Sequence, residues 1–326
     1  MFFLSSFIFH LSSFIFLVEH PQHTFPEDIP PGGYSGITWL GDSLYAVVAD
    51  NMPQDGFFRF SIQLDSLGDI VSARCIDFMN SGIQGRDSEG VAWCDERGTV
   101  FVSGERDNQV LEFQMDGKPT GKKLHLPEIF NTATKSYGIE ALTYNAHTHR
   151  FWTTTESTLP IDGPQATATN GVENKLRMLS FNDSLRQVEQ FFYVMDSPQS
   201  EVQTKHFSHG VSALAAMDDG RLLVLEREFA VPEEIIGACV NCKIYVVEPS
   251  KMHPSCNVAE TPTLPKTLLA EWTTAIGLLD FSIANYEGMC LGPKLPNGGQ
   301  VILLISDSQN QYAGILQDWL KTLVIY

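Results

Sequence analysis

Acidic residues recur along this chain where several of them could hold one metal ion. Three glutamates, Glu89, Glu140 and Glu287, occupy the same place in a repeated phrase whose other two copies carry Ser35 and Ser212. A second acid follows each copy, at the end of a short apolar run: Asp50, Glu105, Glu156, Glu226 and Asp307. Carboxylate oxygens gathered from several strands suit Ca²⁺, and crowded carboxylates need a cation beside them. These eight acids therefore form a predicted calcium site.

The repeated phrase predicts five β-hairpins. Each copy alternates small and large apolar residues, and turn residues and a β-branched or aromatic run follow it. Glu89 and Glu105 centre on position 97, inside the turn Asp95–Gly98, so the two acids belong at the open end of their hairpin. The other four pairs centre on turns in the same way. The five copies are Tyr34–Trp39, Ser88–Trp93, Ile139–Tyr144, Val211–Ala216 and Tyr286–Leu291.

Two further strand-like runs follow most hairpins, which predicts an all-β fold, a β-propeller of four-stranded antiparallel blades. Five blades are favoured, and six are the alternative because two copies begin 72 and 75 residues after the preceding one. The fifth hairpin has a single successor, Leu320–Ile325, so the N-terminal segment near His23–Ile29 is expected to close the ring. The other runs are Phe57–Ile62, Ile70–Phe78, Val110–Gln114, Lys123–Leu126, Lys175–Phe181, Val188–Val194, Lys243–Val247 and Leu268–Trp272.

The charge of the chain bears on its partners. There are 39 acids against 21 lysines and arginines, a net charge of −18. This argues against nucleic acid or an anionic membrane surface as a partner and favours cations. The alternative is that acidity simply keeps a secreted protein soluble.

The N-terminus predicts a destination outside the cytoplasm. Residues Met1–Val18 are apolar except for serines and His10, like the core of a signal peptide, although a basic start and a small-residue cleavage site are missing. A membrane anchor and a misassigned start codon are the alternatives. We therefore divide the chain into this segment, 1–18, and one propeller domain, 19–326, a monomer that is secreted or held in the periplasm or cell envelope.

Three basic residues are candidates for catalysis. Arg106 and Arg227 each follow an acid of the second set, and His209 precedes the fourth copy of the phrase. The alternative for the arginines is an ion pair with a neighbouring blade that locks the ring, and for His209 a structural role. Motifs for a covalent nucleophile, a P-loop, a zinc protease and a dinucleotide fold are absent from the sequence.

Four segments together resemble the phytase-like family, also described as "esterase-like activity of phytase". They are Gly32–Gly36, Asp87–Ala92, Gly210–Leu214 with Arg221–Arg227, and Asn285–Met289 with Leu303–Asp307. The resemblance covers about Gly32 to Tyr326 and implies a secreted propeller with phosphoester hydrolase activity. It carries over to Glu89, Glu140, Glu226, Glu287 and Asp307. The lysine- and tyrosine-bearing phosphate sites of β-propeller phytases are not recognised here, which leaves phytate in doubt as the substrate.

Three functions are compatible with these observations. The first is calcium-dependent hydrolysis of a phosphomonoester or phosphodiester at an acidic channel mouth, with the small anionic substrate bound through the metal. The second is a calcium-dependent lactonase, because such propellers also begin a blade with Glu-Gly before an aromatic residue, as Glu89–Trp93 does. The third is a non-catalytic propeller that binds a glycan or a protein.

Overall fold

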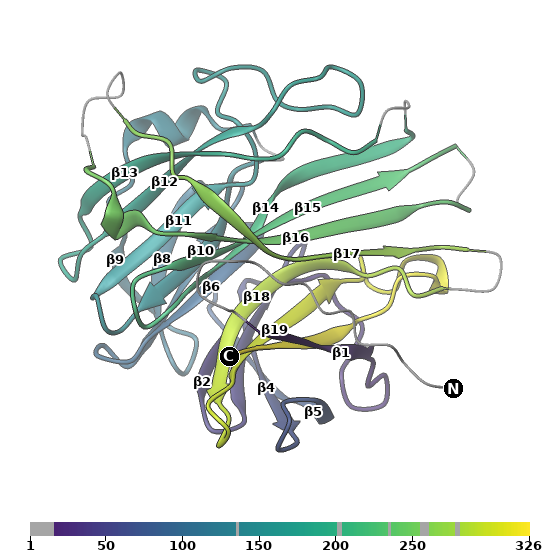
Figure 1. Cartoon of the computed structure of the whole chain (residues 1–326). Helices are drawn as coiled ribbons and strands as arrows, with labels where there is room; N and C mark the ends of the chain where they lie inside the picture. Colours follow the sequence, from purple (N-terminus) through teal and green to yellow (C-terminus); the bar gives the residue numbers. More distant parts are fainter. Residues whose placement is uncertain (1–15, 135–136, 201–203, 234–235, 255–260, 278–280) are drawn as a thin grey trace.

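The computed structural model describes residues 16–134, 137–200, 204–233, 236–254, 261–277 and 281–326. Their strands form five four-stranded antiparallel sheets, the blades of a propeller (Figure 1). Blade 1 contains β2 (Tyr34–Gly41), β3 (Leu44–Ala49), β4 (Gly56–Leu64) and β5 (Ile70–Asn80). Blade 2 contains β6 (Ser88–Cys94), β7 (Thr99–Gly104), β8 (Gln109–Gln114) and β9 (Pro119–Lys123). Blade 3 contains β10 (Ile139–Asn145), β11 (Arg150–Thr155), β12 (Lys175–Phe181) and β13 (Gln187–Val194).

Blade 4 has the longest strands, and blade 5 joins the two ends of the chain. Blade 4 contains β14 (His206–Ala216), β15 (Leu222–Val231), β16 (Cys239–Val247) and β17 (Lys266–Ala275). Blade 5 contains β18 (Asn285–Lys294), β19 (Gln300–Asp307), β20 (Leu320–Ile325) and, as its outer strand, β1 (Leu17–His23). The first strands of successive blades contact one another around a closed ring, β18 against β2 included. The predicted five-bladed propeller closed by the N-terminus is confirmed.

Two strand predictions differ in detail from the structure. The closing strand is Leu17–His23, which pairs with β20, and not the segment His23–Ile29, where a turn containing Pro26 interrupts an extended run. The outer strand of blade 2 is Pro119–Lys123 and not Lys123–Leu126. That strand is a largely exposed edge of Pro, Thr, Gly and Lys residues, so it has no apolar pattern to mark it. Residues 1–15 of the apolar N-terminal segment lie outside the described residues, and no helix of the described part is long and apolar enough to span a membrane.

In blades 1 and 2, the glycine that follows the inner residue of the phrase lets neighbouring blades approach closely. A Cβ atom on Gly90 would lie 2.5 Å from the backbone oxygen of Glu140 and 2.8 Å from the backbone nitrogen of Leu142, both in the next blade. A Cβ on Gly36 would lie 2.3 Å from the backbone oxygen of Glu89 in the same manner. The repeated Gly therefore reflects backbone packing between blades.

We expect Gly90→Val to lower the free energy of unfolding by about 3 kcal/mol, because its side chain meets a backbone that cannot move aside cheaply. Chemical denaturation monitored by circular dichroism measures this change. Ser72→Val, on the exposed face of outer strand β5, is the control and should change stability by less than about 0.5 kcal/mol. Equal stability of both variants would contradict the packing role of Gly90.

Candidate functional site

A register irregularity in every blade sets the inner residues of the site. The pairing between the first and second strands shifts at Ser35 in blade 1, at Ser212 in blade 4 and at Glu287 in blade 5. In blades 2 and 3 it shifts across the steps that contain Glu89 and Glu140. β-Bulges of this kind redirect side chains and are common beside functional sites. All five residues that the repeated phrase aligned thus share one local geometry.

The two serines hold neighbouring blades together. Ser35 Oγ donates a hydrogen bond of 2.8 Å to the backbone oxygen of Ser88 in blade 2. Ser212 Oγ donates one of 3.4 Å to the backbone oxygen of Tyr286 in blade 5. The serine hydroxyls thus bind the backbone of the next blade, whereas the residues at the same position in the other three blades carry carboxylates. The inner set is therefore asymmetric around the ring.

The residue opposite the start of each inner strand is acidic in four blades and basic in one. The backbone N–H groups of Asp50, Glu105 and Glu156 donate to the carbonyls of Gly33, Asp87 and Gly138, and Asp307 pairs with Asn285. In blade 4 the equivalent pair is Gly210 with Arg227. The structure therefore places Arg227, and not Glu226, in the ring with the four acids. Arg106 and Arg227 each follow an acid in the sequence, but they do not occupy equivalent positions, because Arg227 aligns with Glu105.

Glu226 lies one residue before the position of the ring, and both of its carboxylate oxygens accept hydrogen bonds from other residues. Oε1 accepts hydrogen bonds from the Tyr193 hydroxyl, at 2.6 Å, and from Lys266 Nζ, at 2.7 Å. Oε2 accepts one from the backbone N–H of Asp196, at 3.1 Å. These bonds tie Glu226 to blade 3 and to the outer strand of blade 4, and Glu226 belongs to neither of the two carboxylate groups described below.

Two of the inner glutamates are buried without a partner. The exposed fractions of Glu89 and Glu140 are 8% and 5%. Within the described residues, neither carboxylate makes a hydrogen bond or an ion pair, whereas Glu287 accepts from Asn285 Nδ2 at 2.9 Å. A buried carboxylate without compensation is strongly unfavourable as an anion. These two side chains are therefore available to a ligand.

Five carboxylates, including these two, form overlapping groups between blades 2 and 3. Asp87, Glu89 and Glu105 each present an oxygen within 4.8 Å of the others, and so do Glu105, Glu140 and Glu156. Glu105 is common to both groups. Of the eight predicted metal ligands, the structure thus brings Glu89, Glu105, Glu140 and Glu156 together, and it adds Asp87, which the sequence analysis did not select. Glu287, Asp50 and Asp307 lie toward blades 5 and 1.

Arg227 of blade 4 lies beside Glu156, at the end of this acidic cluster nearest blade 4. Its Nη2 lies 2.6 Å from Glu156 Oε1 in blade 3, and its Nη1 lies 3.2 Å from Glu287 Oε1 in blade 5. The residue is 4% exposed, and neighbouring carboxylates raise its pKa against the effect of burial. Arg227 therefore joins blade 4 to both neighbouring blades by ion pairs. This is the structural role that was the alternative to catalysis.

Arg106 is half-exposed and lies at the rim of the site. Its Nη2 lies 3.1 Å from Asp87 Oδ2 and also donates to Asn51 Oδ1 at 3.0 Å. The backbone N–H of Asn51 also donates to Asp87 Oδ1, at 2.6 Å. Arg106 is thus a cation beside the carboxylates that solvent and a ligand can reach.

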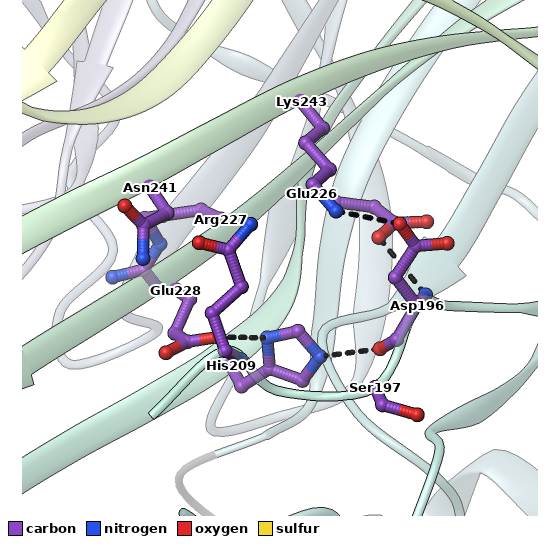
Figure 2. Close-up of a pocket in the computed structure, with 9 residues that line it drawn as sticks. Asp196, Ser197, His209, Glu226, Arg227, Glu228, Asn241 and Lys243 are labelled. Atoms are coloured by element: carbon purple, nitrogen blue, oxygen red, sulfur yellow. Dashed lines mark hydrogen bonds and ion pairs between the residues drawn. The ribbon is translucent and has the colours of Figure 1, made fainter. Parts of the chain in front are cut away.

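His209 lines a small pocket between blade 4 and residues 196–199, and Arg227 also lines it (Figure 2). Its Nε2 lies 3.0 Å from the backbone oxygen of Asp196, which can only accept, so Nε2 carries the hydrogen of the neutral ring. Nδ1 faces Glu228 Oε2 at 3.8 Å, and Glu228 accepts the backbone N–H groups of Gln199 and Ser200. Burial lowers the pKa of His209. The geometry favours a role in holding residues 196–200 over a role in proton transfer.

Burial and mutual repulsion raise the pKa of several carboxyl groups at the site. Burial is the larger cause for Glu105 and Asp307, whose pKa values rise to about 7, and for Asp50, whose pKa rises to about 6. The pKa values of Glu89 and Glu140 are raised well above their usual range for the same reasons. The site therefore gathers carboxyl groups that titrate near neutrality, as general acids and bases do.

These shifts predict that the metal-free protein loses stability as the pH rises. A carboxyl group with a raised pKa binds more protons in the folded state, so its destabilising effect grows from about pH 4 to about pH 7 and then levels off. His209, whose pKa is lowered, acts in the opposite sense, but it is one group against at least five. In chelator, we expect the melting temperature to fall by about 5 °C or more between pH 5.5 and pH 8. Added Ca²⁺ should flatten the profile, and a flat profile without metal would contradict the pKa assignments.

One family model matches most of the chain. The model described as "Phytase-like: Esterase-like activity of phytase" matches residues 29–309. The chain belongs to the phytase-like family. This confirms the resemblance drawn from the four sequence segments. No curated protein gives a significant match to the phytase-like chain.

Several solved structures resemble the phytase-like chain at low sequence identity. A luciferin-regenerating enzyme is 11% identical, with 93% of this chain and 94% of that chain covered and a TM-score of 0.45. A streptogramin B lyase is 10% identical, with 96% and 98% covered and a TM-score of 0.38. Virginiamycin B lyase from Staphylococcus aureus is 9% identical, with 96% and 100% covered and a TM-score of 0.38.

Proposed function

We propose that the phytase-like chain is a calcium-dependent hydrolase of small phosphomonoesters or phosphodiesters, acting at the acidic mouth between blades 2 and 3. The observation that carries the proposal is the pair of buried carboxylates without partners, Glu89 and Glu140, in two groups that share Glu105. Membership of a family described by esterase-like activity supports the class of reaction.

The chemistry of the donors fits calcium. All five candidate ligands are carboxylates, and Ca²⁺ takes six to eight oxygen ligands with flexible geometry. Neither group includes a nitrogen or sulfur donor of the kind that Zn²⁺ prefers. A bound calcium ion would supply charge neutralisation and polarisation of a phosphoryl oxygen and of water.

Residues of the chain can provide the remaining functions. Asp307 is not one of the five candidate ligands, and with a pKa of about 7 it can accept a proton from water near neutral pH. Arg106 lies half-exposed beside Asp87, where it can contact an anionic substrate that enters the mouth. Arg227 is already held by two carboxylates, and we assign it to positioning Glu156 and Glu287.

An assay with and without metal tests the proposal. Purified protein is stripped with a chelator and assayed on nitrophenyl phosphate, its bis-ester and a lactone, before and after addition of Ca²⁺. We expect calcium to raise both the melting temperature and the turnover of at least one phosphoester. Turnover of the lactone alone would favour the lactonase alternative. No turnover, together with no calcium-dependent shift in melting temperature, would exclude both hydrolases and leave a binding propeller.

Export, a monomeric state and a metal-bound anionic substrate stay predictions from the sequence. They belong to the same proposal because an extracellular setting would keep a calcium site of modest affinity filled.

A further inference from the structure

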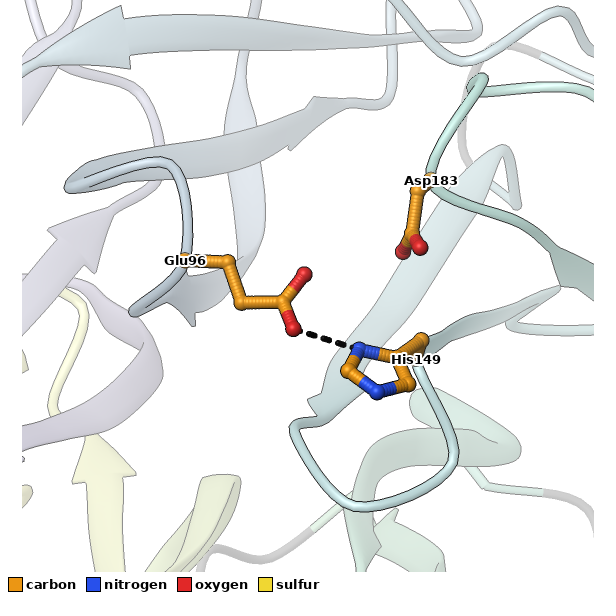
Figure 3. A group of neighbouring side chains, drawn as sticks. All are labelled: Glu96, His149 and Asp183. Atoms are coloured by element: carbon orange, nitrogen blue, oxygen red, sulfur yellow. Dashed lines mark ion pairs between the residues drawn. The ribbon is translucent and has the colours of Figure 1, made fainter.

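A second group of metal-ligating side chains lies at the turn end of blades 2 and 3 (Figure 3). Glu96 comes from the turn between β6 and β7, His149 from the turn between β10 and β11, and Asp183 from the turn between β12 and β13. Their ligand atoms all lie within 4.8 Å of one another. Glu96 lies seven positions after Glu89 along strand and turn, roughly 20 Å at the rise of a β-strand. This group is therefore distinct from the acidic mouth.

The group carries one more negative charge than its own residues can balance. Glu96 Oε1 lies 2.6 Å from His149 Nδ1, an ion pair when the imidazole is protonated. Asp183 makes no hydrogen bond or ion pair with the described residues, although it faces that pair (Figure 3). The nearby Arg97 is held by Glu112, with 2.6 Å between Nε and Oε1. A cation would complete the group.

The neighbouring histidine in the same turn shows the contrast. His147 Nδ1 lies 3.5 Å from Asp218 Oδ1, and the other oxygen of Asp218 lies 2.6 Å from Lys294 Nζ. That arrangement is a balanced surface network with one acid between two bases. The Glu96–His149–Asp183 group has two acids for one imidazole, so it keeps a net negative charge and offers both carboxylate and imidazole donors to a cation.

We propose that Glu96, His149 and Asp183 bind a divalent transition-metal ion of the Zn²⁺ type, with water completing the coordination. One imidazole nitrogen and two carboxylate oxygens suit Zn²⁺, whereas the nitrogen donor disfavours Ca²⁺. His149 and Glu96 are 48% and 42% exposed at their side chains, so they can adjust to the ion as it displaces the proton between them. The ion joins blade 2 to blade 3 at the face opposite the mouth and stabilises the closed ring.

Zinc titration of the intact protein tests this site. Protein without a histidine tag is titrated with Zn²⁺ by calorimetry in excess Ca²⁺, which occupies oxygen-only sites. We expect one equivalent to bind and to raise the melting temperature. His149→Ala and Asp183→Asn should each weaken binding at least about tenfold, because even an outer-shell change costs about that much. His147→Ala, in the same turn, should bind as the wild type does.

Two results would overturn the proposal. Absence of Zn²⁺ binding in excess Ca²⁺ is one of them. The other is an equal loss of binding in His147→Ala and His149→Ala, which would indicate an adventitious ion only. Because both substitutions are at exposed turn residues, and Asp183→Asn provides a second route, a failure to fold cannot produce the expected pattern.

Discussion

Replacing Glu89 or Glu140 by glutamine is expected to lower calcium-dependent turnover at least about 100-fold, since each change removes a charged ligand and not merely an outer-shell contact. Both carboxylates are buried, both lack partners among the described residues, and each belongs to a different one of the two carboxylate groups. Turnover is measured at saturating Ca²⁺ on whichever phosphoester the wild type hydrolyses. Calcium affinity, followed by the shift in melting temperature, should fall in parallel.

The same substitutions should have the opposite effect on the metal-free protein. In chelator at pH 8, Glu89→Gln removes a buried, repelling charge, so we expect the free energy of unfolding to rise by about 1 kcal/mol or more. A residue that merely stabilised the fold would show the reverse. Glu226→Gln is the matched control, because Glu226 is equally buried but is bound by Tyr193 and Lys266 away from the mouth. Full turnover in both Glu89→Gln and Glu140→Gln would place the active site elsewhere, even if calcium still stabilised the protein.

The architecture was predictable because turns and alternating strands are local signals. The turn Asp95–Gly98 and its flanking runs identify a hairpin without any long-range information. Repetition then fixes the fold, since one hairpin is ambiguous and five are not. Strands without an apolar pattern were harder to place: the exposed edge strand Pro119–Lys123 was located several residues too late.

The membership of the site was less predictable because register depends on bulges. Placing each turn at the centre of its hairpin assumes regular strand pairing. On that assumption Glu226, the acid that ends the apolar run of the fourth hairpin, is the predicted partner of Ser212. The spacing held a signal that could have corrected it. Asp50 follows Ser35 by 15 residues, and 15 residues after Ser212 is Arg227. Asp87 was missed because it precedes the phrase, and only the register shows that it lies opposite Glu105.

Compensation of charge cannot be inferred from one sequence. Nothing local distinguishes Glu140, which has no partner, from Glu112, whose carboxylate is held by Arg97. The same holds for the turns of blade 3. In the sequence His149 looks like a solvated turn residue, and Asp183 lies in another turn 34 positions later. Only folding brings the two side chains together.

Arg227→Met is expected to cost about 3–5 kcal/mol of unfolding free energy, the largest stability effect at the site. The substitution removes one partner from a buried pair and leaves Glu156 and Glu287 facing each other without a cation. Denaturant unfolding in chelator at pH 8 measures the loss. Arg106→Met is the control, because its half-exposed ion pair with Asp87 should contribute less than about 1 kcal/mol.

The pH dependence of this loss separates a charge effect from a packing effect. Burial raises the pKa of Glu287, and the Arg227 guanidinium opposes that rise. Without the guanidinium this pKa rises further in the folded state, so the destabilising effect of Glu287 appears only as the pH climbs above the unfolded value near 4. The difference between Arg227→Met and the wild type should therefore shrink at pH 5 and widen at pH 8. Calcium should restore part of the stability by replacing the lost positive charge, which would link Arg227 to the metal site through Glu156. The loss could instead be constant between pH 5 and pH 8 and insensitive to calcium. In that case Arg227 acts by filling space. The electrostatic division of the mouth into an arginine side and a metal side would then be wrong.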